Sequence, residues 1–581
     1  MKKLMIGNEA IARGAYEAGV RVISSYPGTP STEITEIVAQ YDEIYSEWAP
    51  NEKVAMEVAI GASIGGARSM CAMKHVGLNV AADPMFTASY TGVNGGMVII
   101  VADDPGMHSS QNEQDSRHYA RAAKIPMLEP TDSQECLDFV KIAFQISEEF
   151  DTPVLIRLTT RVSHSQSIVE IGERENVPLK DYVKDPAKYV MMPAMARRRH
   201  LFVEERMAKL KDYSNNSELN KIINPGQQTG VVTSGISYQY SRDALKDDVS
   251  YLKVGMVYPL PDKMFADFYN SLEKIYVIEE LEPFIEERFK VLGMNNVTGK
   301  DIFPVYGEYS ARMIREKILG EEKLQETEID DKNIPVRPPV LCPGCPHRGT
   351  YYVLKKLKLN VMGDIGCYTL GALPPLEAMD ACVCMGASVC MAHGIEKARG
   401  KEFAQKTVAV IGDSTFVHSG ITGLADVVYN KGISTVLILD NSITGMTGHQ
   451  ENPTTGRTLK GEATASIDLV KLAEALGIKR VQVCDPYNHK EFEKIVKEEI
   501  KAEEPSVIIA QRPCALLKTV KAQPVFHIDQ EKCRYCKMCL RIGCPSIIDL
   551  GDKVEINDAL CVGCGLCASI CPFGAIVREE D

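Results

Sequence analysis

Short apolar runs alternate with helical patterns along most of the chain. In the first part of the chain, the runs VRVISSYP, GGMVIIVADDP and PVLIRLTT have the β-branched character of buried strands. Residues 54–67 are mostly small and apolar, which indicates a tightly packed helix. Buried strands separated by helices are typical of a parallel sheet with helices on its faces. We therefore expect a first α/β domain at residues 1–190.

The same alternation returns twice. The runs GVVTSG, YLKVGMV and KIYVIEE predict a smaller α/β domain at residues 226–334, and TVAVIGD, STVLILDN and PSVIIAQ predict a larger one at residues 335–525. Residues 191–225 are charged and lack strand character, so we expect a helical linker there. A second charged stretch, which ends in PVRPPV, marks the boundary between the two later domains.

The last part of the chain, residues 526–581, has a different composition. Eight of the 18 cysteines lie there, in two groups whose first members are Cys533 and Cys561. We expect a small, separate α+β module in this tail, appended to a multi-domain α/β fold with parallel sheets.

Composition and charge narrow the class of function. The 581 residues include 65 Lys and Arg against 78 Asp and Glu, a formal net charge of −13, which disfavours nucleic acid binding. No run of 18 apolar residues predicts a membrane span, and the opening MKKLMIGNEA has too short an apolar stretch for a secretion signal. The expectation is a cytoplasmic enzyme whose cysteines serve metal or redox chemistry.

The two cysteine groups of the tail have the spacing of iron–sulfur ligands. Each ends in a Cys-Pro pair, and the second has the two-two-three spacing of bacterial ferredoxins. Three cysteines on one tight loop can hold one cluster, and the fourth then reaches the other cluster. The expected sets are Cys533, Cys536, Cys539 and Cys571 for the first 4Fe–4S cluster, and Cys544, Cys561, Cys564 and Cys567 for the second.

The first group departs from the ferredoxin pattern at one point. Four residues instead of three separate Cys539 from Cys544, which changes the loop without removing a ligand. The alternative is a zinc ribbon or a set of buried structural thiols. Zinc sites use four ligands in two pairs, whereas interleaved triplets with distant fourth members favour two clusters that transfer single electrons.

Polar residues follow two buried strands of the third α/β domain, at the edge where α/β sheets bind ligands. A carboxylate, an amide oxygen and a backbone carbonyl suit the octahedral shell of Mg²⁺ on a diphosphate, and glycines let backbone approach phosphate. The alternative is a pair of ordinary strand-end turns, where Asp, Asn and Gly are common. The candidate groups are Gly412, Asp413, Ser414, Asn441 and the carbonyl of Ile443, with Gly445, Met446 and Thr447 in the loop that follows.

Three segments together resemble one family. They are GNEAIARGAYEAGVRVISSYPGTP, LCPGCPHRGTYY, and GDS with DN before GMTGHQ, and they resemble the 2-oxoacid:ferredoxin oxidoreductases over essentially the whole chain. The fused ferredoxin tail makes the chain similar in particular to the alpha subunits that act on indolepyruvate. The resemblance implies thiamine diphosphate as cofactor, oxidative decarboxylation of an arylpyruvate, coenzyme A as acyl acceptor and ferredoxin as electron acceptor. It also implies a smaller beta subunit as partner, and two thiamine-binding domains around a transketolase-C-terminal-like one.

The resemblance also implies catalytic residues. Activation of thiamine uses a glutamate against the aminopyrimidine ring, which corresponds to Glu52 in WAPNEKVAMEVAIGAS, with Glu57 as the second candidate. A surface glutamate that caps a helix is the competing interpretation of Glu52. Thr29 corresponds to a threonine near the reacting carbonyl, although a plain Pro-Gly turn explains it equally well. Lys74 and His75 are candidates to bind the substrate carboxylate or donate a proton, and a structural histidine is the alternative.

A third iron–sulfur cluster is the least specific expectation. Cys342, Cys345, Cys367 and Cys514 resemble in position the cysteines of a cluster close to thiamine in related enzymes. The alternative is that these thiols are buried and inert. Three further cysteines, Cys382, Cys384 and Cys390, lie among small residues and are expected to pack in a helical core.

Several functions remain open at this point. The same chemistry on phenylglyoxylate or an aliphatic 2-oxoacid is the nearest alternative, because no residue pattern indicates an aryl pocket. A thiamine carboligase without redox chemistry would have no use for the ferredoxin tail. An electron-transfer subunit without decarboxylase activity would have no use for three α/β domains.

Overall fold

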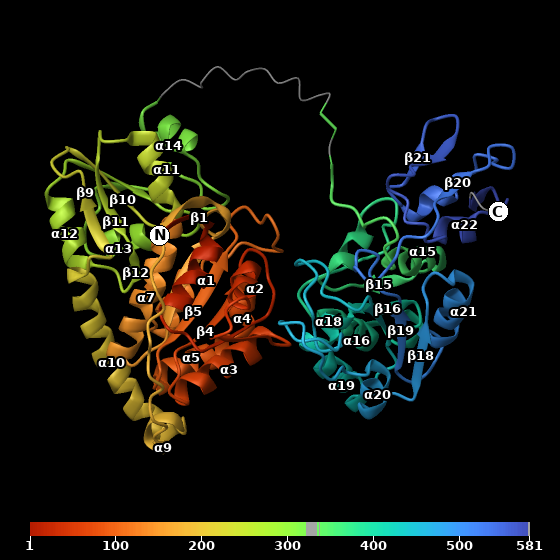
Figure 1. Cartoon of the computed structure of the whole chain (residues 1–581), viewed down its shortest axis with the longest axis horizontal. Helices are drawn as coiled ribbons and strands as arrows, with labels where there is room; N and C mark the ends of the chain where they lie inside the picture. Colours follow the sequence, from red (N-terminus) through yellow and green to blue (C-terminus); the bar gives the residue numbers. More distant parts are fainter. Residues whose placement is uncertain (321–333, 336, 579–581) are drawn as a thin grey trace. The chain divides into compact units, whose positions relative to one another are not determined.

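The computed structural model describes residues 1–320, 334–335 and 337–578, which belong to two compact units, Met1–Ile329 and Asp330–Asp581 (Figure 1). The charged stretch predicted as a domain boundary falls largely on residues 321–333, outside the described residues. No helix among the described residues is long and apolar enough to cross a membrane.

A seven-stranded sheet forms the centre of the first unit. The strand order is β12-β6-β7-β5-β4-β2-β3, and all neighbours are parallel except β12 and β6. The strands are β2 (Val22–Ser25), β3 (Tyr45–Trp48), β4 (Ser69–Lys74), β5 (Met97–Asp103), β6 (Met127–Leu128), β7 (Val154–Thr159) and β12 (Met256–Tyr258). A separate two-stranded antiparallel sheet pairs β1 (Lys2–Ile6) with β8 (Gln166–Glu170).

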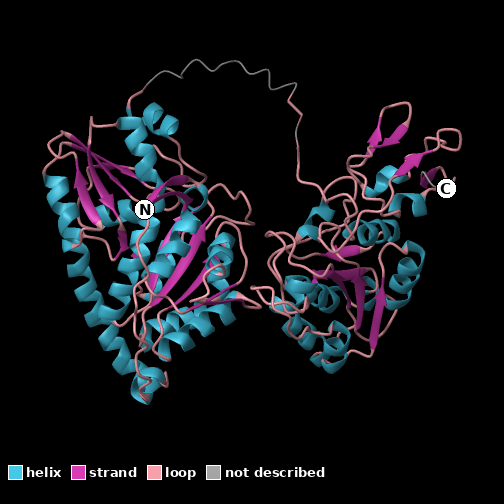
Figure 2. Cartoon of the chain, in the orientation of Figure 1, coloured by secondary structure: helices cyan, strands magenta, loops and turns pink. Residues whose placement is uncertain are grey.

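Helices cover both faces of this sheet, since alternate residues of a strand point to opposite faces. Even-numbered residues of β4 and β5, such as Met70 and Ile100, share a core with α1 (Gly7–Glu17), α2 (Thr32–Val38) and α7 (Ser133–Phe150). Odd-numbered residues, such as Cys71 and Val101, share the other core with α3 (Glu52–Ile64), α4 (His75–Val80), α5 (Ala82–Thr91) and α6 (Arg117–Ala123). The predicted parallel α/β fold is therefore confirmed, and Figure 2 shows its strands among the helices.

A second sheet of five strands belongs to the same unit, in the order β14-β13-β10-β11-β9 with β9 antiparallel. Its strands are β9 (Asn220–Ile223), β10 (Thr229–Thr233), β11 (Ser250–Val254), β13 (Lys274–Ile278) and β14 (Val297–Thr298). The helices around it are α11 (Gly235–Leu245), α12 (Asp262–Asn270), α13 (Phe284–Val291) and α14 (Ala311–Ile318). The predicted linker contains α10 (Pro193–Asn216), preceded by α9 (Pro186–Tyr189), and α8 (Thr160–His164) follows β7.

The run YLKVGMV does not form the single strand that was predicted. It divides at Gly255, so that β11 stays in the second sheet and β12 joins the first. A Cβ at Gly255 would lie 2.4 Å from the carbonyl oxygen of Leu219. The close approach of backbone at this glycine explains the break.

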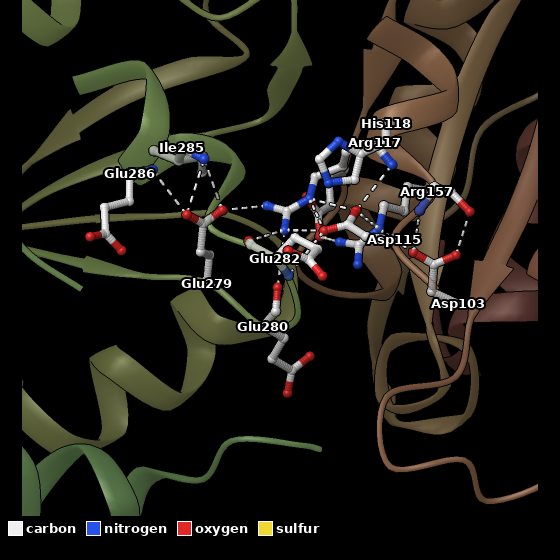
Figure 3. Close-up of polar contacts among 12 residues, drawn as sticks. Asp103, Asp115, Arg117, His118, Arg157, Glu279, Glu280, Glu282, Ile285 and Glu286 are labelled. Carbon is white, nitrogen blue, oxygen red and sulfur yellow. Dashed lines mark hydrogen bonds and ion pairs between the residues drawn. The ribbon is translucent and has the colours of Figure 1, made fainter. Parts of the chain in front are cut away.

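A buried network of ion pairs joins the two sheets of the first unit (Figure 3). Arg117 Nη1 lies 2.5 Å from Glu279, beside β13, and its Nη2 lies 2.5 Å from Asp115. Arg157 on β7 donates from Nε to Asp103 at 2.6 Å. Although burial raises the pKa of Asp115, Arg117 and Arg157 hold it well below its usual range. The two guanidinium groups therefore keep Asp115 charged, whereas burial outweighs Arg117 at Glu279 and raises the pKa of that carboxyl.

Replacing Arg117 by methionine is expected to lower the free energy of unfolding of this unit by about 3–5 kcal/mol, because two buried carboxylates lose their partner. Fluorescence of Trp48, the one tryptophan of the chain, reports the unit during a urea titration. Arg121→Met is the matched control, since its guanidinium also stacks on Phe284 but its pair with Glu287 is exposed. Loss of this exposed ion pair should lower the free energy of unfolding by only about 0–1 kcal/mol. Equal losses in both variants would contradict the prediction.

The second unit is built on a parallel sheet in the order β15-β16-β17-β19-β18. Its strands are β15 (Asn360–Met362), β16 (Thr407–Gly412), β17 (Thr435–Asp440), β18 (Arg480–Cys484) and β19 (Ser506–Gln511). One face packs on α15 (His347–Leu357) and α21 (His489–Glu499), and the other on α16 (Ala387–Arg399), α19 (Ile421–Tyr429) and α20 (Leu469–Ala475). Short helices α17 (Lys401–Ala404) and α18 (Asp413–Thr415) flank β16.

The cysteine-rich tail is a small α+β module within the second unit. Strand β20 (Phe526–Ile528) pairs with β23 (Ile576–Arg578), and β21 (Ile547–Asp549) pairs with β22 (Val554–Ile556). Helix α22 (Leu566–Ile570) lies between β22 and β23 in sequence. Apolar residues of all these elements share one core with several of the cysteines.

The prediction of helical core packing for three other cysteines was only partly correct, because Cys390 alone of the three lies in a helix, α16. Cys382 and Cys384 precede α16 in a non-helical segment, and Cys384 and Cys390 are exposed. The physical reason is Gly386, whose φ of +86° delays the helix to Ala387.

Candidate functional site

Three oxygen-bearing groups converge at the carboxyl edge of the second unit's sheet. Asp413 follows β16 and is 2% exposed, and Asn441 follows β17. The end of the Asn441 side-chain amide lies 3.2 Å from Oδ1 of Asp413 and 2.8 Å from the carbonyl oxygen of Ile443. Without a cation, the amide nitrogen can donate to both oxygens; turned over, the amide presents its own oxygen beside theirs. Carboxylate, amide and carbonyl oxygens together fit Mg²⁺.

Electrostatics favour a cation at the same place. Burial, and then the neighbouring carboxylate of Asp440, raise the pKa of Asp413 to about 7. Thr454 opposes this by donating a hydrogen bond from Oγ1 to Oδ2 of Asp413 over 3.3 Å. A divalent cation would compensate the two acids and restore the charged form of Asp413.

The predicted phosphate loop lies beside these oxygens. The hydroxyl groups of Ser414 and Thr444 are 3.0 Å apart. A Cβ at Gly445 would lie 3.7 Å from Nδ2 of Asn441 and 3.4 Å from Sγ of Cys367. Met446 is exposed, and the hydroxyl of Thr447 donates to the side chain of Gln450 over 2.5 Å. Gly445 therefore lies close to the amide of Asn441, whereas Thr447 forms a hydrogen bond within its own loop.

Each expected cysteine set of the tail lines one cavity. Cys544 shares a cavity with the second group, and Cys571 shares the other with the first group, so each set contains a cysteine from both halves of the tail. In the described residues, no group of three or more His, Cys, Asp or Glu side chains forms a ready site for a metal ion. Four thiols around one cavity fit a 4Fe–4S cluster. The linings include Cys544, Cys561, Cys564 and Cys567 in one cavity and Cys533, Cys536, Cys539 and Cys571 in the other.

The four cysteines of the expected third cluster also lie near one another. Burial, and then the proximity of Cys514 and Cys342, raise the pKa of Cys367 to about 11. Burial likewise raises the pKa of Cys345 to about 12, with Cys367 and Cys342 among its neighbours. The backbone N–H of Cys514 donates to the carbonyl oxygen of Asn441 over 2.9 Å. This third cysteine group therefore adjoins the Asp413 site.

The third group also adjoins the tail. Gly344, between Cys342 and Cys345, lines the cavity of the second cluster set. A Cβ at Gly344 would lie 3.7 Å from Cβ of Cys564. Within the second unit, the Asp413 site, the third cysteine group and the second set thus follow one another in space.

The first unit carries the remaining expected residues, near the carboxyl edge of its sheet. Thr29 follows β2, Lys74 ends β4, and Glu52 and His75 begin α3 and α4. A Cβ at Gly28 would lie 3.2 Å from Cγ of Lys74, and one at Gly77 would lie 2.5 Å from Oε1 of Glu52. Two glycines thus let backbone approach these side chains closely.

Burial distinguishes the two candidate glutamates. Glu52 is 5% exposed, whereas Glu57 is exposed and paired with Lys53 on the same helix. The helix is capped by Asn51, whose side chain accepts a hydrogen bond from the N–H of Val54 over 2.9 Å. The alternative of a surface glutamate that caps the helix therefore does not describe Glu52.

His75 is buried and Lys74 half-buried, and both contact backbone carbonyls. Burial lowers the pKa of Lys74 to about 8, although Asp104 and Glu52 oppose the shift, and Nζ donates to the Ser109 carbonyl over 2.9 Å. His75 Nε2 lies 3.1 Å from the carbonyl oxygen of Asn112. A carbonyl only accepts, so Nε2 carries the hydrogen and Nδ1, buried without a hydrogen-bond partner among the described residues, is the acceptor of the neutral ring. In this neutral form Nδ1 can accept a proton, whereas the proton donor considered above would be the ring with hydrogens on both nitrogens.

The loop that supplies these carbonyls, residues 104–116, has no counterpart among the sequence predictions. Its first residue, Asp104, follows Asp103 at the end of a buried strand, as Asp413 follows β16. That pattern was the available signal. The partners of the loop lie far away in sequence and give no signal of their own.

Comparison with known proteins places this geometry in a family. Residues 13–224 match the thiamine diphosphate-binding domain of pyruvate flavodoxin/ferredoxin oxidoreductase. Residues 364–510 match the C-terminal thiamine pyrophosphate-binding domain of thiamine pyrophosphate enzymes, and residues 554–577 match the 4Fe–4S binding domain.

Full-length relatives are more specific. The chain is 41% identical to the indolepyruvate oxidoreductase subunit IorA of Pyrococcus horikoshii, over all of this chain and 98% of that protein. It is 40% identical to the IorA subunit of Archaeoglobus fulgidus, over 99% of this chain and 97% of that one. It is also similar to a 2-oxoglutarate:ferredoxin oxidoreductase structure from Magnetococcus marinus, at 17% identity, with a TM-score of 0.46 over 55% of this chain and 65% of that one, a likeness too distant to carry an argument. The chain belongs to the family of indolepyruvate oxidoreductase IorA subunits, among the 2-oxoacid:ferredoxin oxidoreductases.

Proposed function

We propose that the chain is the large subunit of an enzyme that oxidatively decarboxylates arylpyruvates, indolepyruvate above all. The products are the arylacetyl-coenzyme A, carbon dioxide and reduced ferredoxin. The observation that carries the proposal is the similarity to IorA subunits over the full length of the chain. The buried oxygen site and the cysteine-lined cavities supply the groups that this chemistry needs.

Each candidate residue has a role in this proposal. Asp413, Asn441 and the Ile443 carbonyl would hold Mg²⁺ on the diphosphate of thiamine diphosphate. The cofactor supplies a nucleophilic carbon and stabilises the electrons left by departing carbon dioxide. Glu52 would share a proton with the aminopyrimidine ring, and Lys74 would bind the carboxylate of the 2-oxoacid.

Two further residues would act at the reacting carbonyl. Thr29 would contact the carbonyl itself. His75 would accept a proton or hydrogen bond at Nδ1, because Asn112 fixes the hydrogen on Nε2.

Electrons would leave one at a time through the cysteines of the second unit. We propose a third 4Fe–4S cluster at Cys342, Cys345, Cys367 and Cys514, because these residues adjoin both Asn441 and Cys564. The cluster of the Cys544 set and then that of the Cys533 set would follow, and ferredoxin would accept the electrons.

The proposal includes a partner and a place. A smaller beta subunit would complete the enzyme, as the name "subunit" of the relatives suggests. The many free cysteines suit a reducing compartment, so we place the enzyme in the cytoplasm and expect it to need anaerobic conditions.

Two other functions are alternatives to this proposal. The first is the same reaction on phenylglyoxylate or an aliphatic 2-oxoacid; a subunit of 2-oxoglutarate synthase from Methanothermobacter thermautotrophicus is 31% identical over 29% of this chain. The second is an electron-transfer subunit without decarboxylase activity. Removal of thiamine diphosphate would leave such a carrier unharmed.

The test is anaerobic reduction of a viologen dye by the chain purified with its smaller partner. Indolepyruvate, phenylpyruvate, phenylglyoxylate, pyruvate and 2-oxoglutarate are compared, each with and without coenzyme A and thiamine diphosphate. Reduction that needs both cofactors and favours the aryl acids supports the proposal. Reduction with aliphatic acids alone contradicts the substrate, and no reduction by the iron-replete, thiamine-loaded complex contradicts the enzyme.

The third cluster predicts a specific iron content. Anaerobically purified chain should hold about 12 iron atoms with three 4Fe–4S clusters, and about 8 with two. Exchange of both Cys342 and Cys367 for serine should lower the content by about 4. The control is Cys390→Ser, an exposed cysteine outside the three groups. If wild-type chain holds about 8 iron atoms and the double exchange does not change this number, the four cysteines do not bind a cluster and the proposal is contradicted.

A further inference from the structure

One loop of the first unit contacts three of the residues proposed to meet the substrate. Residues 104–116 connect β5 with α6. The Ser109 carbonyl accepts from Nζ of Lys74 over 2.9 Å, and the Ser109 hydroxyl donates to the Thr29 carbonyl over 3.2 Å. The Asn112 carbonyl accepts from Nε2 of His75 over 3.1 Å. The loop thus holds Thr29, Lys74 and His75 without contributing a reactive side chain of its own.

Asp104 folds this loop back on itself. Its Oδ2 accepts from the N–H of Ser109 over 2.8 Å and from the hydroxyl of Ser110 over 2.7 Å. Its Oδ1 accepts from the hydroxyl of Thr160 over 2.7 Å. Burial raises the pKa of Asp104, but the hydrogen bonds from Ser110 and Thr160 and the charge of Lys74 outweigh it and lower the pKa. The charged carboxylate therefore fixes Ser109 at the place where it meets Lys74.

The far side of the loop is tied to the region of the second sheet. Glu113 Oε1 accepts from the N–H of Gly106 over 2.6 Å and from the N–H of Gly307 over 2.8 Å. His108 Nε2 lies 2.9 Å from Glu308. These ties connect residues that are almost 200 positions apart in sequence.

The end of the loop is anchored more deeply. Asp115 and Arg117 belong to the buried ion network, in which Arg117 reaches Glu279 (Figure 3). The hydroxyl of Ser116 donates to Oδ1 of Asp103 over 2.5 Å. The loop begins directly after β5, and the contact of Ser116 with Asp103 also fixes its other end to this strand.

We propose that residues 104–116, the strap, are a positioning element through which the second-sheet region controls the 2-oxoacid site. Gly307, Glu308 and Glu279 set the place of the strap, and the strap in turn sets the position of Lys74 and the hydrogen of His75. The inference rests on the proposed function for the identity of the substrate. It gives the smaller α/β region a part in turnover although none of the catalytic candidates belongs to it.

The chemistry of the contacts determines what loosening the strap does. Without the Ser109 carbonyl, the ammonium group of Lys74 loses an acceptor that orients it toward a substrate carboxylate. Without the Asn112 carbonyl, the neutral ring of His75 can carry its hydrogen on either nitrogen. A displaced strap therefore raises KM for the 2-oxoacid and lowers kcat, while the cysteines and the Asp413 site in the other unit keep their cofactors.

Glu113 offers a matched pair of variants. Both of its partners are backbone N–H groups on one oxygen, so Glu113→Gln can keep the acceptor while Glu113→Ala removes it. In the complete complex with the beta subunit, Glu113→Ala should raise KM for the 2-oxoacid and lower kcat, together reducing kcat/KM about tenfold or more. Glu113→Gln should stay within about twofold of the wild type. Iron content and bound thiamine diphosphate should be unchanged in both.

A second readout does not depend on turnover. Amide hydrogen exchange of the complex should be faster in Glu113→Ala, but not in Glu113→Gln, in peptides that cover 104–116 and also 72–80. His108→Ala removes only the exposed ion pair with Glu308, so it tests the strap even if Glu113→Ala does not fold. It should raise KM, lower kcat and speed the exchange at 104–116 and 72–80, each by less than Glu113→Ala does.

The outcomes separate the two proposals. Unchanged kinetics together with unchanged exchange at 72–80, or equal losses in Glu113→Ala and Glu113→Gln, would overturn the strap. A wild-type complex without 2-oxoacid activity would overturn the proposed function. In that case, faster exchange at 72–80 in Glu113→Ala alone would still support the strap as a positioning element.

Discussion

Exchange of Glu52 for glutamine should lower kcat for viologen reduction by roughly 10²- to 10⁴-fold, the usual contribution of a side chain that transfers a proton in the transition state. Glutamine keeps the size of the side chain and removes the ionisable proton. Iron content should not change, because the cysteines lie elsewhere in the chain, and the proposed Mg²⁺ site that would hold the diphosphate keeps all its groups. Steady-state kinetics with saturating 2-oxoacid and coenzyme A measure the effect.

Two further variants show whether burial at this position matters. Glu57→Gln, on the exposed side of the same helix, should keep wild-type kcat. Gly77→Ala should lower kcat strongly although Glu52 itself is unchanged. The new Cβ would lie 2.5 Å from Oε1 of Glu52 and would push the carboxylate out of its position. Full activity in Glu52→Gln would exclude Glu52 as the activating acid, and a loss in Glu57→Gln would point to that residue instead.

Exchange of Asp413 for asparagine should have two opposite effects. Thiamine diphosphate should no longer bind in a Mg²⁺-dependent way, because the cation loses its one charged ligand among the three oxygens. The cofactor-free chain, however, should melt at a higher temperature than the wild type at pH 8, because the variant no longer buries a carboxylate beside Asp440. Calorimetric titration of Mg²⁺ and thiamine diphosphate measures the first effect, and thermal unfolding of cofactor-free chain measures the second.

The pH dependence of the second effect has a definite sign. The carboxyl of Asp413 titrates near 3.8 when unfolded and near 7 when folded. Between these values, unfolding releases a proton, so stability is fully present below about pH 3.8 and falls as pH rises toward 7. The advantage of Asp413→Asn should therefore shrink when the melts are repeated at pH 5. Asp426→Asn, an exposed acid on α19, is the control. Retained Mg²⁺-dependent binding in Asp413→Asn would place the cation elsewhere.

Much of the fold could be predicted because its signals are local. A buried strand needs a short β-branched run, so β5, β7, β16 and β17 follow directly from the letters of the chain. Cysteine spacing is equally local, since three of the four cysteines in each expected set share one loop. The cavities of the tail contain the sets that the ferredoxin pattern predicts, including the exchange of the fourth cysteine.

Contacts between distant segments could not be predicted in this way. The pair of Arg117 with Glu279 spans 162 residues, and nothing near either residue indicates the other. The strap depends on such contacts at Gly307 and Glu308. The division of YLKVGMV at Gly255 depends on the backbone at Leu219, which lies in another segment.

The candidate site lies between these extremes. Resemblance indicated Thr29 and His75, and it ranked Glu52 before Glu57, an order with which the burial of Glu52 agrees. The tautomer of a neutral His75, in contrast, could be assigned only from the carbonyl of Asn112. Proximity of the four cysteines of the third group was likewise not visible in their spacing, because Cys514 follows Cys345 by 169 positions.

The crossing of one cysteine between the two halves of the tail has a consequence for how the subunit is supplied with iron. Each cavity draws three thiols from one half and the fourth from the other, so neither half can complete a cage while its counterpart is unfolded. If each cavity holds a cluster as proposed, filling should be all-or-none, and damage by oxygen to one cluster would disturb the lining of the other cavity. A cell short of iron would then contain fewer complete copies of the enzyme, rather than many copies with one cluster missing. Its ferredoxin would be reduced more slowly, but the free energy available for each electron transfer would stay the same.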